Sequence, residues 1–99
     1  MSFSSLKTQA LVDTGAAASF LAQRLLIGIP YEEVKEISNV NISTQLFRTV
    51  SGELVKPRGC YELTIKLARR HSFKHTFFVM SELEEGCILG YDFLAANEI

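Results

Sequence analysis

Apolar and polar side chains alternate over much of this chain, which is typical of β-strands that bury one face. The longest such stretches are residues 40–50 and 54–67, both rich in Val, Ile, Thr, Phe and Tyr. The Ser-Gly dipeptide at 51–52 separates them as a turn, so the pattern predicts a long hairpin. Pro57 and Gly59 are expected to bend its second arm, because proline cannot donate a hydrogen bond to a neighbouring strand.

Shorter apolar runs on both sides of this hairpin predict further strands. Residues 6–12 alternate loosely and end in an apolar triplet, which suits a strand that runs into the interior. After a second turn at residues 68–72, residues 73–80 predict a strand and residues 87–89 a short buried one. An acidic loop at residues 82–86 is expected to join these two strands.

Helical spacing is confined to two short segments. The first is expected to begin at Ser19, whose hydroxyl can cap a helix, and to end at Gly28 and Pro30. Its apolar face would consist of Phe20, Leu21, Leu25 and Leu26. The second is expected to begin at Asp92, while residues 32–37 fit a strand or a helix equally well. The chain is therefore predicted to be mainly β, with two small helices.

Length and composition fit one folded domain spanning residues 1–99. The chain is 47% apolar and 21% charged, with a net charge of -1, and it contains neither a linker nor a low-complexity tract. No apolar stretch approaches the roughly 20 residues needed to cross a bilayer, and no secretory signal is visible. We therefore expect an intracellular, cytoplasmic protein that has no membrane partner.

Cysteine and histidine are the residues to consider for a metal site. Cys60 and Cys87 lie far apart without CxxC spacing, so we expect two buried thiols and neither a zinc site nor a disulfide. The basic residues near the second turn are Arg69, Arg70, His71, Lys74 and His75. Because no third ligand and no interleaved exposed aromatic residues accompany them, we interpret them as a solvated turn that binds neither metal nor nucleic acid.

The candidate chemistry is concentrated at residues 10–16, Ala-Leu-Val-Asp-Thr-Gly-Ala. There an apolar strand delivers the carboxylate of Asp13 into a tight turn that a glycine permits. Asp-Thr-Gly alone is weak support for a site, since Asp and Gly are common in turns. A second motif at residues 88–94, Ile-Leu-Gly-Tyr-Asp-Phe-Leu, strengthens it.

In order and spacing, these motifs resemble those of the retropepsin-like aspartic proteases, in particular the branch of Gypsy-type long-terminal-repeat retrotransposons. The resemblance covers nearly the whole chain: the catalytic motif, its Ser-Phe-Leu continuation at 19–21, a hairpin that resembles the family's flap, and residues 87–94. It implies an acid-protease fold with one lobe per chain, in which closed β-structure carries a flap hairpin and a short C-terminal helix.

The resemblance also implies a homodimeric aspartic endopeptidase in which two Asp13 side chains face each other. Two carboxylates held close share a proton, so one activates water while the other protonates the carbonyl oxygen of the substrate. Thr14 is implied to hydrogen-bond across the dimer, and Gly15 to let the substrate backbone approach. The implied substrate is a peptide or a retrotransposon polyprotein, and the implied reaction needs no metal or organic cofactor.

The implied substrate-binding residues follow the catalytic turn or lie on the flap. They are Ala16, Ala17, Val50, Ser51 and Gly52. The flap is expected to close over a bound peptide and exclude water, although a plain hairpin would have the same sequence pattern. Asp92 is a rival acid within the same chain, but at the start of a helix it is better interpreted as a partner of backbone amides.

Two positions depart from the retroviral pattern. Retroviral members commonly pair an acidic residue, two positions after the catalytic-loop glycine, with an Arg directly after the later glycine; Ala17 and Tyr91 stand there instead. Both charges are absent together, so no orphan charge remains. The alternative function is a domesticated retropepsin-like domain that acts as a dimerisation or peptide-binding module with little or no turnover. The intact Asp-Thr-Gly motif favours the enzyme.

Overall fold

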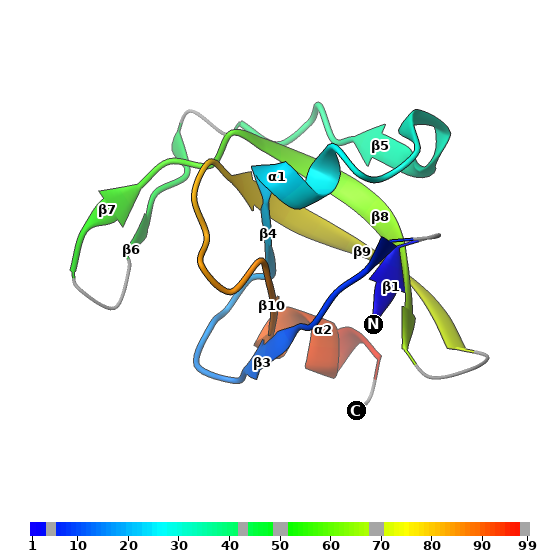
Figure 1. The fold of residues 1–99 in the computed structure, drawn as a ribbon. Helices are drawn as coiled ribbons and strands as arrows, with labels where there is room; N and C mark the ends of the chain where they lie inside the picture. The colour runs from blue at the N-terminus through cyan, green and yellow to red at the C-terminus, as the bar shows by residue number, and fades with distance from the viewer. Residues whose placement is uncertain (4–5, 42–43, 49–51, 68–70, 98–99) are drawn as a thin grey trace.

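Two long antiparallel strands, β8 (Gly59–Leu67) and β9 (His71–Met80), form the frame of the molecule (Figure 1). The structure is a computed structural model, and it describes residues 1–3, 6–41, 44–48, 52–67 and 71–97. Leu63 and Ile65 of β8 and Phe77 and Val79 of β9 are buried, each pair at alternate positions of its strand. This period of two places one face of the pair on the core, as the sequence pattern predicted.

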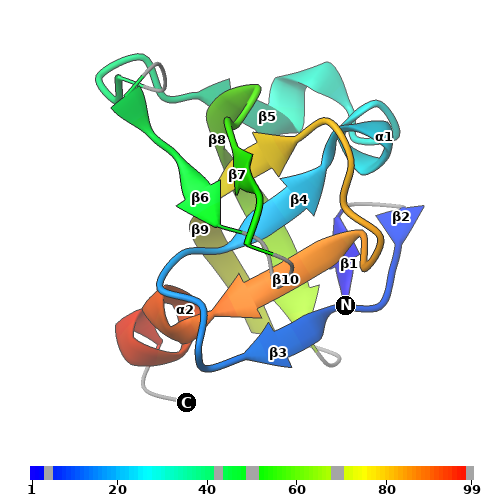
Figure 2. The same cartoon turned by 90° about the vertical axis from the view of Figure 1, so that its left-hand side faces the viewer.

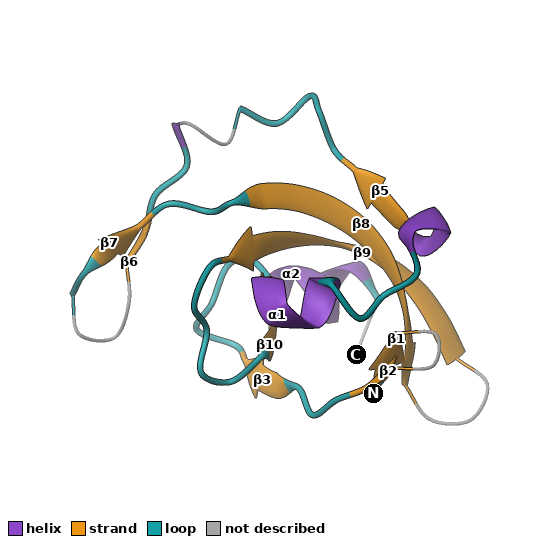
Figure 3. Cartoon of the chain, turned by 45° about the horizontal axis from the view of Figure 1, so that its top comes forward, coloured by secondary structure: helices purple, strands orange, loops and turns teal. Residues whose placement is uncertain are grey.

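The other strands extend this pair into a curled sheet in the order β2-β1-β8-β9-β4-β10-β3. Their bounds are Ser2–Phe3 for β1, Leu6–Lys7 for β2, Leu11–Asp13 for β3, Phe20–Ala22 for β4 and Cys87–Gly90 for β10. β4 runs parallel to β9, β10 antiparallel to β4, and β3 parallel to β10. Figure 3 shows β8 and β9 arching over β10 and β3, so the sheet curls around its own core. The chain is therefore mainly β, as predicted.

The helices are short, and the first begins later than predicted. Helix α1 spans Gln23–Leu26, and α2 spans Tyr91–Ala96 directly after β10. The prediction of helix over Phe20 and Leu21 was wrong, because both residues belong to β4, which pairs with β9 on one side and β10 on the other. Sheet pairing in the centre of the fold outweighs a weak local preference for helix. Correspondingly, the side chain of Ser19 caps no helix.

The ambiguous segment at residues 32–37 contains both kinds of structure. A 3-10 turn, η1 (Tyr31–Glu33), leads into β5 (Val34–Glu36), which pairs with β8. The strand predicted over residues 6–12 was wrong in extent, since it is divided between β2 and β3 with no strand at 8–10. The predictions at residues 73–80 and 87–89 and at the second helix are confirmed.

The predicted long hairpin exists as a short two-stranded sheet, β6 (Phe47–Arg48) and β7 (Leu54–Val55). Its second arm does not run unbroken to residue 67, because the ladder stops before Pro57, which is buried, and β8 begins at Gly59. Figure 2 shows this hairpin lying in front of β4, and within the described residues its two strands pair only with each other. The hairpin is therefore a separate projection from the main sheet.

The core lies between the arching strands and α2. Its largest buried side chains include Phe3, Phe77 and Phe93, and the rings of Phe3 and Phe77 meet edge to face with centroids 5.9 Å apart.

Cys60 and Cys87 are buried free thiols, which confirms the prediction of two buried thiols. In the part of the chain that the structure describes, no helix is long and apolar enough to cross a membrane.

Because the two thiols are buried, we expect the free energy of unfolding to depend on pH in the alkaline range. Burial raises the pKa of Cys87 from 9.0 to about 12 and also raises the pKa of Cys60. Between pH 9 and about 12 the unfolded chain loses a proton that folded Cys87 keeps, so the free energy of unfolding should fall as pH rises through that range. Urea unfolding at pH 8 and pH 10 should show this fall, and Cys87→Ala should reduce it. A fall of the same size in Cys87→Ala would contradict the assignment.

Candidate active site

Asp13 ends strand β3 at the edge of the sheet and begins a tight turn. Its backbone carbonyl accepts a hydrogen bond from the amide of Ala16 at 3.1 Å, which closes the turn. Its Oδ1 accepts a second one from the amide of Gly15 at 2.9 Å. The carboxylate is partly exposed, with one oxygen held by the backbone of its own loop. A fixed, solvent-accessible carboxylate is the arrangement that proton transfer requires.

The two sequence motifs form one structural unit. β10 lies beside β3 with Gly90 opposite Asp13, and the amide of Tyr91 donates to the carbonyl of Ala16 at 2.7 Å. A Cβ on Gly90 would lie 2.7 Å from the carbonyl oxygen of Ala16 and closer still to that of Ala18. Since both obstacles are backbone, glycine alone fits here. The end of β10 is thus pressed against the loop that carries Asp13.

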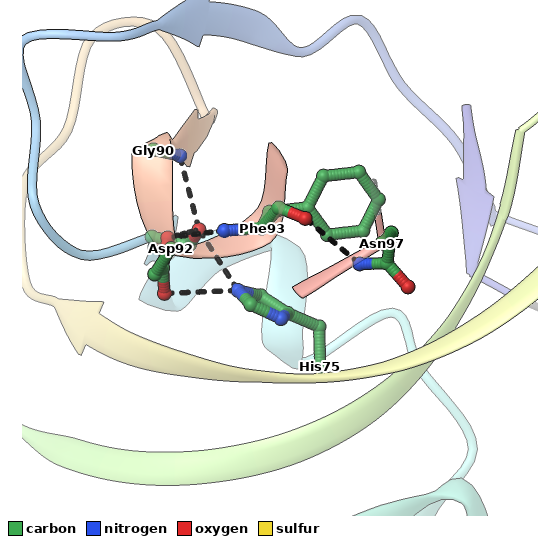
Figure 4. Close-up of polar contacts among 6 residues, drawn as sticks. His75, Gly90, Asp92, Phe93 and Asn97 are labelled. Atoms are coloured by element: carbon green, nitrogen blue, oxygen red, sulfur yellow. Dashed lines mark hydrogen bonds and ion pairs between the residues drawn. The ribbon is translucent and has the colours of Figure 1, made fainter. Parts of the chain in front are cut away.

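Beneath this contact lies a buried polar network (Figure 4). Ser19, only 1% exposed, donates from Oγ to Asp92 Oδ1 at 2.7 Å and accepts the amide proton of Gly90 at 3.0 Å. His75 Nε2 lies 3.1 Å from the same Oγ and 3.0 Å from Asp92 Oδ2. Because Ser19 gives its one proton to Asp92, Nε2 must carry the hydrogen that His75 shares with both oxygens. The network joins β9, β10 and α2 to Ser19, which follows the loop that carries Asp13.

This network contains Ser, His and Asp, but its geometry is not that of a nucleophilic triad. Ser19 and Asp92 meet the same ring nitrogen, whereas a triad uses one nitrogen for each partner. The hydroxyl is also buried away from solvent. Asp92 Oδ1 further accepts the amide of Phe93 at 2.8 Å, so the interpretation of Asp92 as a partner of helix amides is confirmed.

The interpretation of His75 as part of a solvated turn was wrong. Its side chain is only 10% exposed, and its ring stands edge to face against Phe77 and Phe93, with centroids 5.4 and 5.1 Å away. It projects from the inner face of β9 to Asp92. Arg69 and Arg70 lie outside the described residues. Within the described residues, no three His, Cys, Asp or Glu side chains gather as a metal site would require.

A groove of about 550 Å³ separates the β6–β7 hairpin from the main sheet. Asp13 and Ala16 line it on the sheet side, and Phe47 of β6 on the hairpin side. The ring of Phe47 packs on Phe20 of β4 and Phe78 of β9, with centroids 4.8 and 4.9 Å apart. Aromatic contacts of this kind contribute about 0.5 to 1.5 kcal/mol each beyond area burial. They hold the hairpin over the sheet and form one end of the groove.

The loop that joins β9 to β10 gives the groove an acidic wall. Glu82, Leu83, Glu84 and Glu85 all line it. The guanidinium of Arg24 in α1 binds the backbone of this loop. Nη1 donates to the carbonyl of Leu83 at 2.8 Å, and Nη2 donates to the carbonyl of Glu84 at 3.2 Å. The three glutamates are thus carried on a braced loop.

Only part of the predicted site lines this groove. Asp13 and Ala16 do, whereas Thr14, Gly15 and Ala17 are exposed in the adjoining loop and do not line it. Gly52 is exposed in the hairpin with a positive φ of 90°, and its carbonyl accepts Arg48 Nη1 at 2.9 Å. Val50 and Ser51 lie outside the described residues. The sequence analysis missed the aromatic end of the groove, its acidic wall and the polar network beneath the loop.

The same edge of the molecule exposes large apolar side chains. Leu11 and Val12 of β3 are 48% and 55% exposed, and Tyr91, beside the loop that carries Asp13, is 59% exposed. β3 is the last strand of the sheet, and edge strands readily pair with other chains.

Comparison of the chain with family models and with curated proteins found no match.

Removal of the Ser19 hydroxyl tests the polar network. Ser19→Ala leaves the amide of Gly90 buried without its acceptor and deprives Asp92 and His75 of a partner. The free energy of unfolding in urea should fall by about 1 to 3 kcal/mol. Ser72→Ala, on the exposed face of β9, is the matched control and should stay within about 0.5 kcal/mol of the parent protein. Equal effects of the two substitutions would show that the network is not structural.

Proposed function

We propose that this chain is one subunit of a homodimeric aspartic endopeptidase with a retropepsin-like fold, in which a pair of Asp13 side chains activates water. The observation that carries the proposal is the position of Asp13, held by its own loop at the wall of a groove large enough for a peptide. The curled sheet, the hairpin that projects from it and the helix after the last strand support the proposal (Figure 1).

Asp13 suits general base catalysis better than the other carboxylates of the groove. Its Oδ1 is positioned by the amide of Gly15, whereas Glu82, Glu84 and Glu85 make no side-chain hydrogen bond within the described residues. A general base must be held within reach of the proton that it removes. Asp92 is unsuited, because its carboxylate is bound by Ser19 and His75 and does not line the groove.

One Asp13 per chain cannot act as base and acid in the same step, so the mechanism needs a second copy. The exposed apolar edge formed by Leu11, Val12 and Tyr91 lies next to Asp13 and supports an interface there. Thr14 makes no side-chain hydrogen bond within the described residues, which leaves its hydroxyl for a partner subunit. In the dimer the paired carboxylates share a proton, so one activates water and the other protonates the substrate carbonyl.

The substrate of this proposal is an extended peptide within a polyprotein, such as that of a retrotransposon. The alternative is a domesticated relative that dimerises or binds peptides through the same groove without turnover. The two differ in whether the wild-type protein cleaves the bound peptide, with Asp13 as the base, or only binds it.

Cleavage by the wild-type protein separates the two, and replacement of Asp13 by Asn tests the mechanism. Asp13→Asn is nearly isosteric, so the circular dichroism spectrum and the unfolding midpoint should stay close to those of the parent protein. Cleavage of a fluorogenic peptide library should fall by at least about 10²-fold, because the variant has lost its general base. Glu32→Gln, an exposed carboxylate in η1 outside the groove, should leave cleavage unchanged. Undiminished cleavage in Asp13→Asn would sink the proposed mechanism.

A further inference from the structure

The groove combines an apolar floor with an acidic wall. We call the apolar lining that the sheet and the hairpin share the floor; it consists of Phe20, Phe47, Val55, Met80 and Ile88. At about 550 Å³ it is larger than one side chain requires, so it can hold an apolar residue of a peptide together with a neighbour. A floor of this kind would accept large apolar side chains, whatever the charge of the residues beside them.

The wall carries far more negative charge than the protein as a whole. The net charge of the chain is only -1, yet four carboxylates line the groove: Asp13, Glu82, Glu84 and Glu85. Among the described residues that line the groove, Arg48 is the one cation, and its guanidinium donates to the carbonyl of Gly52. None of the three glutamates forms an ion pair within the described residues. Their charge is therefore available to a bound peptide.

The acidic loop is held in place and not merely solvated. Besides the two hydrogen bonds from Arg24 to the carbonyls of Leu83 and Glu84, the amide of Gly86 donates to Leu83 at 3.1 Å. The carbonyl of Gly86 accepts the amide of Ala22 at 2.8 Å, which ties the loop to β4. Gly86 adopts a φ of 80°, which favours glycine. Charges on a braced loop act on a ligand at little ordering cost.

We propose that this groove selects peptides in which a large apolar residue is flanked by Lys or Arg. The inference rests on the proposed function for the peptide, and it adds the preferred sequence. The apolar side chain packs on the floor, while the aliphatic stem of the basic neighbour lies along the floor and its charged end reaches the glutamates. An acidic neighbour is repelled by the same carboxylates, so the groove discriminates by attraction and by repulsion.

Matched peptides test this preference. Three peptides should differ only at the residue next to a central Phe, which is Lys, Gln or Glu. Wild-type protein should cleave the Lys peptide about tenfold more efficiently than the Glu peptide, as kcat/KM, because each exposed charge contact contributes only a few-fold. The difference should shrink at high salt.

Variants of the wall assign the preference to its glutamates. In the triple variant Glu82→Gln, Glu84→Gln, Glu85→Gln, the Lys and Glu peptides should be cleaved about equally. The double variant Glu32→Gln, Glu33→Gln removes exposed carboxylates outside the groove and should keep the wild-type preference. The single reversal Glu84→Lys should shift the preference toward the Glu peptide, which gives a second test if the triple variant does not fold.

The outcomes separate this inference from the proposed function. If all three peptides are cleaved at equal rates, the inferred sequence preference is wrong, while the proposed protease function is supported. If no peptide is cleaved, the binding of fluorescein-labelled forms of the same peptides to wild-type protein still decides. Tighter binding of the Lys peptide, lost in the triple variant, supports the inference while the protease proposal fails. Equal binding, or none, overturns the inference.

Discussion

The site depends above all on the contact between Gly90 and the loop that carries Asp13. The missing side chain of Gly90 lets the end of β10 come against the carbonyls of Ala16 and Ala18. The amide of Tyr91 and the pairing of β10 with β3 then fix both ends of the loop. Without this close approach, Asp13 would lie at the end of a short, unsupported edge strand. With it, the loop that carries the carboxylate is tied to β10, an inner strand of the sheet.

The polar network extends this support to the rest of the molecule. Ser19 accepts the amide of Gly90, and His75 and Asp92 bind Ser19 from β9 and α2. Buried polar groups are costly unless each is satisfied, and within the described residues no buried side-chain nitrogen or oxygen lacks a partner. The network therefore specifies how the helix, the long strand and the loop fit together. The hairpin is attached differently, through the aromatic contacts of Phe47 with Phe20 and Phe78. The groove lies between the loop that carries Asp13 and the hairpin that carries Phe47.

Local features of the sequence predicted the turn at Asp13, the strands at residues 73–80 and 87–89 and the last helix. Each depends on neighbours in the chain, such as Asp-Thr-Gly for a turn or an apolar triplet for a buried strand. The failures have a common cause in contacts between distant residues. Phe20 and Leu21 have helical spacing but become a strand because β9 and β10 lie on both sides. His75 looked like part of a basic turn because its partner, Asp92, is 17 positions away. The acidic segment 82–86 was recognised as a loop. Its position beside a groove depends on the pairing of β10 with β3, which the sequence pattern did not reveal.

The central claim is that two chains contribute one Asp13 each to a single site. Mixing subunits tests it most directly: wild-type protein is exchanged with increasing amounts of Asp13→Asn at constant total concentration, and peptide cleavage is measured after equilibration. If only dimers with two Asp13 side chains are active, cleavage should fall with the square of the wild-type fraction. A fall in direct proportion to the wild-type fraction would mean that each chain works alone, and it would contradict the shared site.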